Sequence, residues 1–329
     1  MTPLFSRRRL LRSVAATVIA AAEDIPASGD VEITAEPVAF DGDPGPSQIG
    51  RLTYRGGVVL SSYDQRFGGW SDLEISAVGD RLTMISDLGH FLDAPLSLDD
   101  AGGPRGVGPA LIGKLIDPVG NPLLSRRASD AEGLARAPDG GFYVSFEGWH
   151  RIWHYPGGAG SFRLPPRIVP PPPGLAGAPG NGGLEAIAAW PDGGIVALAE
   201  EFRDGQGDHR GWIDGPQDWR DFTWAQSGFS PTGAAIAPDG TLLVLERRFA
   251  MLSFAARIVQ VSRAACRAGG RVAGNELAAW GPPRLIDNFE GLTARRGRGG
   301  ETLIYLVSDD NFFSPIQRTL LVCFEIRPG

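Results

Sequence analysis

The chain has 329 residues, an ordinary hydrophobic content of 43%, 46 glycines, 27 prolines and a formal net charge of −7. This length can bury a full core, and the many turn-forming residues are typical of one all-β unit. The acidic balance, with Lys114 as the only lysine, argues against nucleic acid as a partner.

The N-terminal residues predict an export signal. Residues 6–12 (SRRRLLR) are similar to a twin-arginine signal, and residues 13–22 are apolar and end in small residues. Cleavage after Ala22 would leave residues 23–329 as a single domain in the periplasm. The apolar stretch is too short for a membrane span, which needs about 18 residues. A basic cytoplasmic N-terminus is the alternative.

An acidic sequence motif recurs along the rest of the chain. Its copies are residues 70–87, 129–147, 181–200, 230–246 and 287–311. Each copy is two apolar runs joined by a turn, three times Pro-Asp-Gly, which supplies the backbone angles of a tight turn. The acids Glu74, Glu132, Glu185 and Glu290 align at a period of about fifty residues, with Ala234 in the degenerate fourth copy.

A period of this length is the signature of a β-propeller or a solenoid. We therefore predict an all-β propeller whose blades each contain one motif as their two inner strands. The length expected after signal cleavage, divided by the period, gives between five and six blades, and we predict six, with five as the alternative. One blade is expected to close by pairing an N-terminal strand with C-terminal ones, which removes an exposed sheet edge.

The acids of the motif are expected to meet at one axial mouth, because an antiparallel hairpin returns to where it began. Carboxylate oxygens suit a hard divalent metal, calcium before magnesium. The predicted metal ligands are Glu74, Glu132, Glu185, Glu290 and Asp309. The predicted catalytic acids are Asp87, Glu147, Glu200 and Glu246, with Glu147 or Glu200 as general base. The alternative for each glutamate is a scaffold role, in which it caps backbone amides of a neighbouring blade.

Three arginines stand beside the same strand ends, namely Arg66, Arg247 and Arg318. They are predicted to bind an anionic substrate group through two parallel hydrogen bonds. The alternative is that each neutralises a carboxylate.

Two further pairs leave alternatives open. Cys266 and Cys323 could form a disulfide after export or remain buried thiols, and a structural role is favoured over a metal site for His150 and His154.

Several blocks of the chain resemble a known family. RFGGWSDLEIS, SDAEGLARAPDGGFYVSFE, GGLEAIA, LLVLERRF, NFEGLTAR and LVSDDNF are similar to blocks of the bacterial phytase-like proteins with "esterase-like activity of phytase". The resemblance runs from about Arg66 to the C-terminus. It implies a propeller-like repeat with recurring Glu and Asp, and a phosphoesterase-type activity.

The sequence therefore predicts an exported, monomeric, calcium-dependent hydrolase of small anionic phosphate esters. No G-x-S-x-G, Walker or H-E-x-x-H motif suggests another enzyme class. Two alternatives remain: a non-catalytic propeller that binds a ligand or protein with a structural calcium, and a lactonase-type propeller esterase. Either enzyme would lose turnover to a chelator, whereas the binding propeller would show binding alone.

Overall fold

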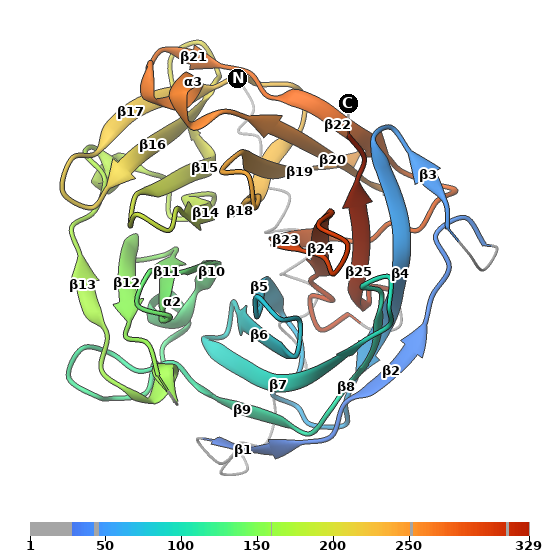
Figure 1. Cartoon of the computed structure of the whole chain (residues 1–329). Coiled ribbons are helices and arrows are strands. Elements are labelled where there is room, and N and C mark those ends of the chain that lie inside the picture. The colour runs from blue at the N-terminus through green and yellow to red at the C-terminus, as the bar shows by residue number, and fades with distance from the viewer. Residues whose placement is uncertain (1–27, 43–45, 159, 251–252, 314–315, 329) are drawn as a thin grey trace.

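Each sequence motif folds as an antiparallel hairpin, because its two apolar runs are rich in residues that pack well on a pleated sheet. The computed structural model describes residues 28–42, 46–158, 160–250, 253–313 and 316–328. These residues form five sheets in a ring around a central axis (Figure 1). The protein is an all-β propeller with five blades, the smaller of the two predicted numbers. The export segment lies outside the described residues.

The first three blades are numbered in chain order, and their strands are given from the axis outward. Blade 1 contains β5 (Trp70–Ile75), β6 (Arg81–Ser86), β7 (His90–Leu98), β9 (Ala110–Lys114) and β1 (Ser28–Val31), with β8 (Pro104–Val107) beside β7. Blade 2 contains β10 (Ala131–Arg136), β11 (Phe142–Phe146), β12 (Arg151–Tyr155) and β13 (Arg167–Val169). Blade 3 contains β14 (Leu184–Ala189), β15 (Ile195–Arg203), β16 (His209–Gly215), β17 (Arg220–Trp224) and β21 (Arg271–Val272).

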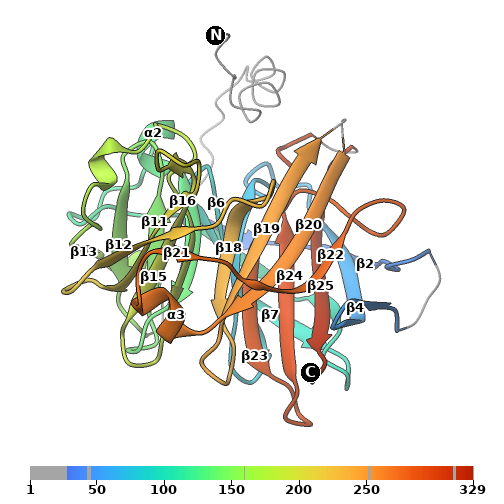
Figure 2. The same cartoon turned by 90° about the horizontal axis from the view of Figure 1, so that it is seen from above.

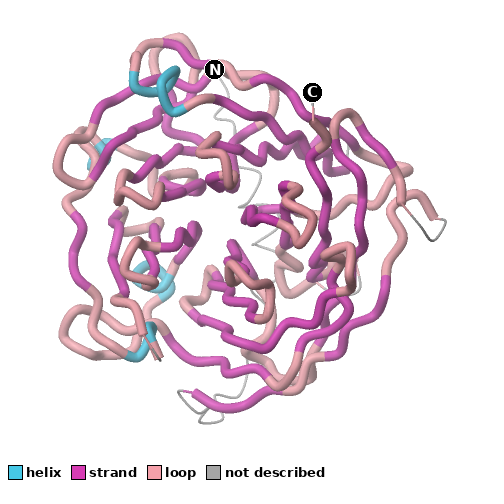
Figure 3. The backbone as a smooth tube through the Cα atoms, viewed as in Figure 1, coloured by secondary structure: helices cyan, strands magenta, loops and turns pink. Residues whose placement is uncertain are grey.

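The remaining blades complete the ring. Blade 4 contains β18 (Ser230–Ile236), β19 (Leu242–Ala250), β20 (Ser253–Val261) and β22 (Asn275–Trp280). Blade 5 contains β23 (Phe289–Arg296), β24 (Thr302–Ser308), β25 (Thr319–Ile326), β4 (Leu52–Ser61) and β2 (Thr34–Pro37), with β3 (Gln48–Ile49) beside β4. The short helices are α2 (Arg126–Ser129), α3 (Arg263–Arg267), η1 (Ser161–Arg163) and η2 (Leu175–Gly177). Strands dominate the backbone, as Figure 3 shows.

The ring is closed by strands from both ends of the chain. In blade 5 the C-terminal strand β25 pairs with β4, from Thr319 opposite Leu60 to Ile326 opposite Leu52. The predicted closure is therefore confirmed. Each inner strand also contacts the next one around the axis, in the order β5, β10, β14, β18, β23 and back to β5. The two ends of this axis differ: α2 and the β19–β20 hairpin rise at one end, whereas the C-terminus lies at the other (Figure 2).

The core lies between blades. The described residues form five apolar clusters, and each cluster joins the facing surfaces of two adjacent blades. Between blades 5 and 1, for example, Met84 and Leu92 pack in one cluster with Tyr305 and Leu321. Each blade is therefore stabilised by both of its neighbours, which fixes the inner strands around the axis.

The two cysteines belong to different clusters and are free thiols. Cys266 lies in α3 and Cys323 in β25, and both are fully buried. Burial raises the pKa of each thiol to about 12. The free-thiol alternative is therefore confirmed. Among the described helices, none is long and apolar enough to cross a membrane.

Candidate functional site

Every inner strand carries a β-bulge near its first residue. At the bulge one residue is skipped in the pairing with the second strand, which redirects that residue's side chain. The skipped residues of blades 1 to 5 are Ser71, Glu132, Glu185, Thr232 and Glu290. The structure therefore aligns Ser71 and Thr232 with the three glutamates, where the sequence alignment had placed Glu74 and Ala234.

Two more positions per blade lie beside each bulge. The second strand ends with a backbone N–H that donates to the carbonyl two residues before the bulge, at 2.8 Å between Glu147 and Asp130 and 3.0 Å between Asp309 and Asn288. In blade 4 the corresponding pair is Arg247 and Ser230. In every blade, three positions together form what we call the axial mouth: the skipped residue, the residue two before it, and the residue at the end of the second strand. They are Gly69, Ser71 and Asp87; Asp130, Glu132 and Glu147; Gly183, Glu185 and Glu200; Ser230, Thr232 and Arg247; and Asn288, Glu290 and Asp309.

Most of the predicted acids lie at this mouth. They are Asp87, Glu132, Glu147, Glu185, Glu200, Glu290 and Asp309. Asp309 shows how crowded the acids are. Burial, and then the charges of Glu290, Asp87 and Asp310, raise its pKa well above the ordinary range.

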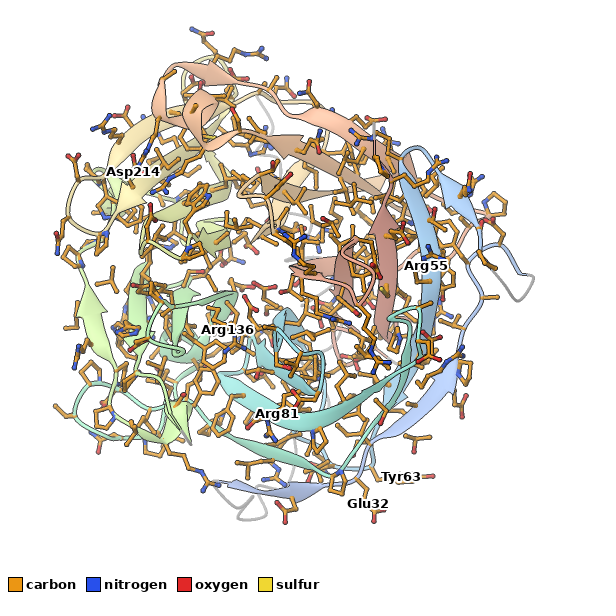
Figure 4. All side chains as sticks on the ribbon, in the orientation of Figure 1. Glu32, Arg55, Tyr63, Arg81, Arg136 and Asp214 are labelled. Atoms are coloured by element: carbon orange, nitrogen blue, oxygen red, sulfur yellow. The ribbon has the colours of Figure 1, made fainter. Side chains whose placement is uncertain are left out.

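Glu74 does not lie at the mouth, so its predicted position is wrong. It pairs with Thr83 near the turn of the hairpin, and at about 3.3 Å per residue it lies roughly 10 Å along β5 from Ser71. Its carboxylate accepts hydrogen bonds from the Arg136 backbone N–H and the Thr293 hydroxyl, both at 3.2 Å. Burial raises its pKa, and Arg136, seen beside the axis in Figure 4, opposes that shift. Glu74 therefore joins the inner strands of blades 1, 2 and 5, which is the scaffold alternative.

The predicted position of Glu246 is also wrong. It pairs with Pro231, one residue before the mouth position, and successive side chains of a strand point to opposite faces. Its carboxylate accepts hydrogen bonds from Trp224 Nε1 at 2.7 Å and from Arg257 Nη1 at 2.8 Å. Burial raises its pKa. Glu246 thus packs between blades 3 and 4, and Arg247 takes the mouth position of blade 4.

Arg247 neutralises acids of two other blades. Its Nη2 lies 3.0 Å from Glu200 Oε1, and its Nη1 lies 2.5 Å from Glu290 Oε1. Nη1 also donates to Asn288 Oδ1. Because the Arg247 side chain is only 9% exposed, these are buried ion pairs. The guanidinium therefore balances the charge on the side of the mouth formed by blades 3 and 5.

The other two predicted substrate-binding arginines are engaged in ion pairs. Arg66 is buried and holds Asp64 through two hydrogen bonds, Nε to Oδ1 at 2.9 Å and Nη2 to Oδ2 at 2.7 Å. Arg318 is partly exposed, and its Nε lies 3.3 Å from Asp287 Oδ2. Both arrangements favour the neutralising alternative, and substrate contact by either arginine remains a prediction.

The acids of blade 2 form a tight group. Carboxylate oxygens of Asp130, Glu132 and Glu147 all lie within 4.8 Å of one another, and all three residues are buried. Glu147 Oε1 also accepts the backbone N–H of Gly183 at 2.5 Å. Sequence reasoning missed Asp130. The sequence did contain a signal for it, because Asp130 precedes Glu132 by the same spacing as Asn288 precedes Glu290.

A second missed residue is Asp72, which follows the bulge of blade 1. Its carboxylate is fully buried and accepts the backbone N–H groups of Leu73 at 2.8 Å, Leu134 at 2.7 Å and Leu292 at 3.1 Å. Burial raises its pKa well above the ordinary range, while these three hydrogen bonds oppose the shift. Asp72 therefore ties the inner strands of blades 1, 2 and 5 together.

The histidines have separate partners, as the structural interpretation expects. His154 Nε2 lies 3.1 Å from Asp139 Oδ1, and His150 Nε2 lies 2.8 Å from the Pro179 carbonyl oxygen. They do not converge on a common point, and neither is a mouth position.

Comparison with known proteins identifies the family. The family model described as "Esterase-like activity of phytase" matches residues 65–312. The chain belongs to the phytase-like family. No curated protein matches it.

Solved propeller structures are similar in fold to this phytase-like chain. A candidate gluconolactonase has a TM-score of 0.45 and 11% identity, covering 89% of this chain and 93% of its own. A gluconolactonase from Xanthomonas campestris has a TM-score of 0.40 and 15% identity, covering 90% and 88%. Virginiamycin B lyase from Staphylococcus aureus has a TM-score of 0.40 and 10% identity, covering 85% and 87%. At this level of similarity none of them bears on the reaction of this protein.

Proposed function

We propose that this phytase-like propeller hydrolyses small anionic esters, phosphate esters first, at its axial mouth with a divalent cation, most simply calcium. One observation carries the proposal. Four blades bring a carboxylate to the mouth from the end of their second strand, whereas blade 4 brings the guanidinium of Arg247. Such a mouth offers an acidic side for a cation and a basic side for an anion.

The acids of blade 2 would hold the cation, because Arg247 already balances Glu200 and Glu290 on the other side. Oxygen ligands of this kind suit calcium or magnesium. A bound cation would polarise an ester oxygen and lower the pKa of a water molecule.

The chain's own residues supply orientation, charge and a base. Arg247 is held by Glu200, Glu290 and Asn288, so its guanidinium is fixed in place before any substrate arrives. A buried, preorganised cation of this kind can stabilise negative charge that develops on an ester group. We assign Glu200 to accept a proton from water, because its ion pair with Arg247 fixes the direction of its carboxylate.

Turnover measurements test the proposal. The purified protein should hydrolyse a phosphomonoester or phosphodiester in the presence of calcium, and a chelator should abolish the reaction. Glu200→Gln should lower kcat by about a hundredfold or more, as expected for loss of a general base. The matched control is Asp218→Asn, an exposed acid whose side chain is 77% accessible, and its turnover should equal that of the wild type.

The same assay separates the alternatives. Turnover of lactones without turnover of phosphate esters would replace the substrate class but keep the mouth as the site. Binding of calcium without turnover of any ester would contradict the proposed hydrolysis and favour a ligand-binding propeller.

A further inference from the structure

We infer that blade 2 by itself builds a specific site for one divalent cation from Asp130, Glu132 and Glu147, at the side of the mouth instead of on the propeller axis. The catalytic purpose of this site rests on the proposed function, whereas its cation binding does not require turnover. The ligand set differs from the predicted ring of Glu74, Glu132, Glu185, Glu290 and Asp309, because it draws on a single blade.

The spacing of the three carboxylates fits one ion. Two oxygens that bind the same calcium at about 2.4 Å can lie at most about 4.8 Å apart. Oxygens of Asp130, Glu132 and Glu147 meet this limit for every pair. Three buried negative charges at this spacing repel one another strongly, so a cation between them would stabilise the folded state.

Asp130 gives a second and independent reason. It is only 6% exposed, and its buried Oδ1 has no hydrogen-bond partner in the part of the chain that the structure describes. A buried carboxylate oxygen in this state is costly unless a ligand satisfies it.

Arg151 lies close enough to Asp130 for the carboxylate to raise the pKa of the guanidinium, against the larger effect of burial, and Arg151 has partners of its own. Arg151 donates hydrogen bonds to the carbonyl oxygens of Ala128 and Trp149. It also stacks 3.8 Å from the ring centre of Phe146 and 4.2 Å from that of Trp153. Arg151 is therefore held by backbone oxygens and aromatic rings.

Blade 5 shows what fills the equivalent place when the protein supplies its own cation. Its mouth residues are Asn288, Glu290 and Asp309, in the same register as Asp130, Glu132 and Glu147. There Nη1 of Arg247, from the preceding blade 4, donates to both Asn288 Oδ1 and Glu290 Oε1.

Blade 2 differs from blade 5 in two ways. It has the acid Asp130 in place of the neutral Asn288, and its preceding blade presents Asp87 where blade 4 presents Arg247. The other blades have glycine or serine at the position of Asp130, namely Gly69, Gly183 and Ser230. Among the mouth positions, only those of blade 2 are all acidic, and the position from which Arg247 serves blade 5 is taken by the acid Asp87 in the blade that precedes blade 2.

The chemistry of the ligands selects the kind of ion. Three carboxylates without a nitrogen or sulfur ligand favour a hard cation over zinc. Calcium accepts irregular oxygen coordination, whereas magnesium needs near-ideal octahedral geometry and keeps several waters. We therefore expect calcium to bind more tightly than magnesium.

Calcium titration of the chelator-treated protein by calorimetry tests the inference. The wild type should bind one calcium ion, and saturating calcium should raise its Tm. Asp130→Asn, which gives blade 2 the amide found in blade 5, should weaken calcium binding by about tenfold or more, because affinity follows the number of charged ligands. The matched control Asp309→Asn removes a mouth acid from blade 5 and should change the affinity by less than about twofold.

Melting of each variant without calcium shows whether it is folded, and Glu147→Gln provides a second ligand variant. Equal losses of affinity in Asp130→Asn and Asp309→Asn would overturn the blade 2 site in favour of an axial ring. Ester turnover without calcium binding would also overturn it, while leaving the mouth as an active site. If Asp130→Asn weakens calcium binding but the protein hydrolyses no ester, the result would support the blade 2 site and contradict the proposed hydrolysis.

Discussion

At the scale of single residues, the mouth depends on one guanidinium that serves three blades. Arg247 belongs to blade 4, yet its ion pairs are with Glu200 of blade 3 and Glu290 of blade 5. The residue before it, Glu246, faces Trp224 and Arg257 in the interface between blades. A shift of one residue along β19 thus separates an interface residue from a mouth residue.

Replacing Arg247 by methionine should strongly destabilise the fold. The change keeps much of the side-chain volume but leaves Glu200 and Glu290 buried without their cation, and loss of one partner from a buried ion pair costs about 3–5 kcal/mol. Urea unfolding in the presence of chelator measures the effect. The control Arg220→Ala removes an exposed ion pair with Asp218, which should cost at most about 1 kcal/mol. Equal effects of the two changes would show that Arg247 is not a hub of the mouth.

The pKa of Asp309 gives a prediction for pH. Burial raises its pKa in the folded state, whereas in the unfolded chain an aspartate has a pKa of about 3.9. The unfolded state therefore loses the Asp309 proton first as the pH rises. Compared with Asp309→Asn, the wild type should lose stability above about pH 4, by up to about 1.4 kcal/mol per pH unit, and level off above the raised pKa.

Chelator-treated wild type and Asp309→Asn should be unfolded in urea at several pH values. Asp64→Asn provides a control of opposite sign, because the hydrogen bond from Arg66 lowers the pKa of Asp64. Relative to that variant, the wild type should lose stability as the pH falls through the lowered pKa. A constant difference between wild type and Asp309→Asn across this pH range would contradict the raised pKa.

At the scale of strands and hairpins, the bulge explains both the success and the errors of the sequence prediction. Alternation and turn chemistry predicted each hairpin, and the closure of blade 5 followed from the need to remove an edge. The bulge adds one residue that no pattern of period two reveals. Glu74 was therefore aligned three residues too late, and Asp130 was overlooked although its spacing to Glu132 matches that of Asn288 to Glu290.

The position after the bulge shows how closely the inner strands pack. A Cβ atom added to Gly291 would lie 2.7 Å from the Cα of Asp72, and one added to Gly133 would lie 2.6 Å from Ile187 Cγ2. Blade 1 alone has a carboxylate at this position, and Asp72 uses it to accept backbone N–H groups from two neighbouring blades. These hydrogen bonds join blade 1 to blade 2 and to blade 5, the last blade of the ring.

Asp72→Ala should therefore destabilise the propeller by about 3 kcal/mol or more. The backbone N–H groups of Leu73, Leu134 and Leu292 would lose a buried acceptor, and an unsatisfied buried donor costs about 1–3 kcal/mol. The control Asp93→Ala removes a partly exposed ion pair with Arg81 and should cost no more than about 1 kcal/mol. Urea unfolding measures both, and hydrogen exchange at Leu134 and Leu292 should quicken only in Asp72→Ala. Unchanged exchange there would show that Asp72 does not join the blades.

At the scale of the whole molecule, closure requires both ends of the described chain. Strand β4 completes blade 5 only when β25 is present, and β25 ends at Ile326. The ring therefore cannot close until nearly the whole chain has been synthesised, and the five apolar clusters between blades form together with it. A propeller of this kind is expected to unfold as one cooperative unit, since each blade buries its faces against both neighbours.

We also propose a periplasmic location, and late closure of the ring is compatible with it. A chain that closes only after synthesis suits the twin-arginine route, which carries folded proteins, and residues 6–12 have the arginine pattern of its signals. Replacing Arg7, Arg8 and Arg9 by lysine keeps the positive charge but removes the arginines that the route reads. The folded precursor should then accumulate in the cytoplasm, which cell fractionation and immunoblotting would show. As a control, Arg12→Lys should leave export intact, because it lies after the consecutive arginines. Unchanged periplasmic accumulation of the triple variant would mean that the chain uses another route or another signal, and the proposed folding before export would lose its support.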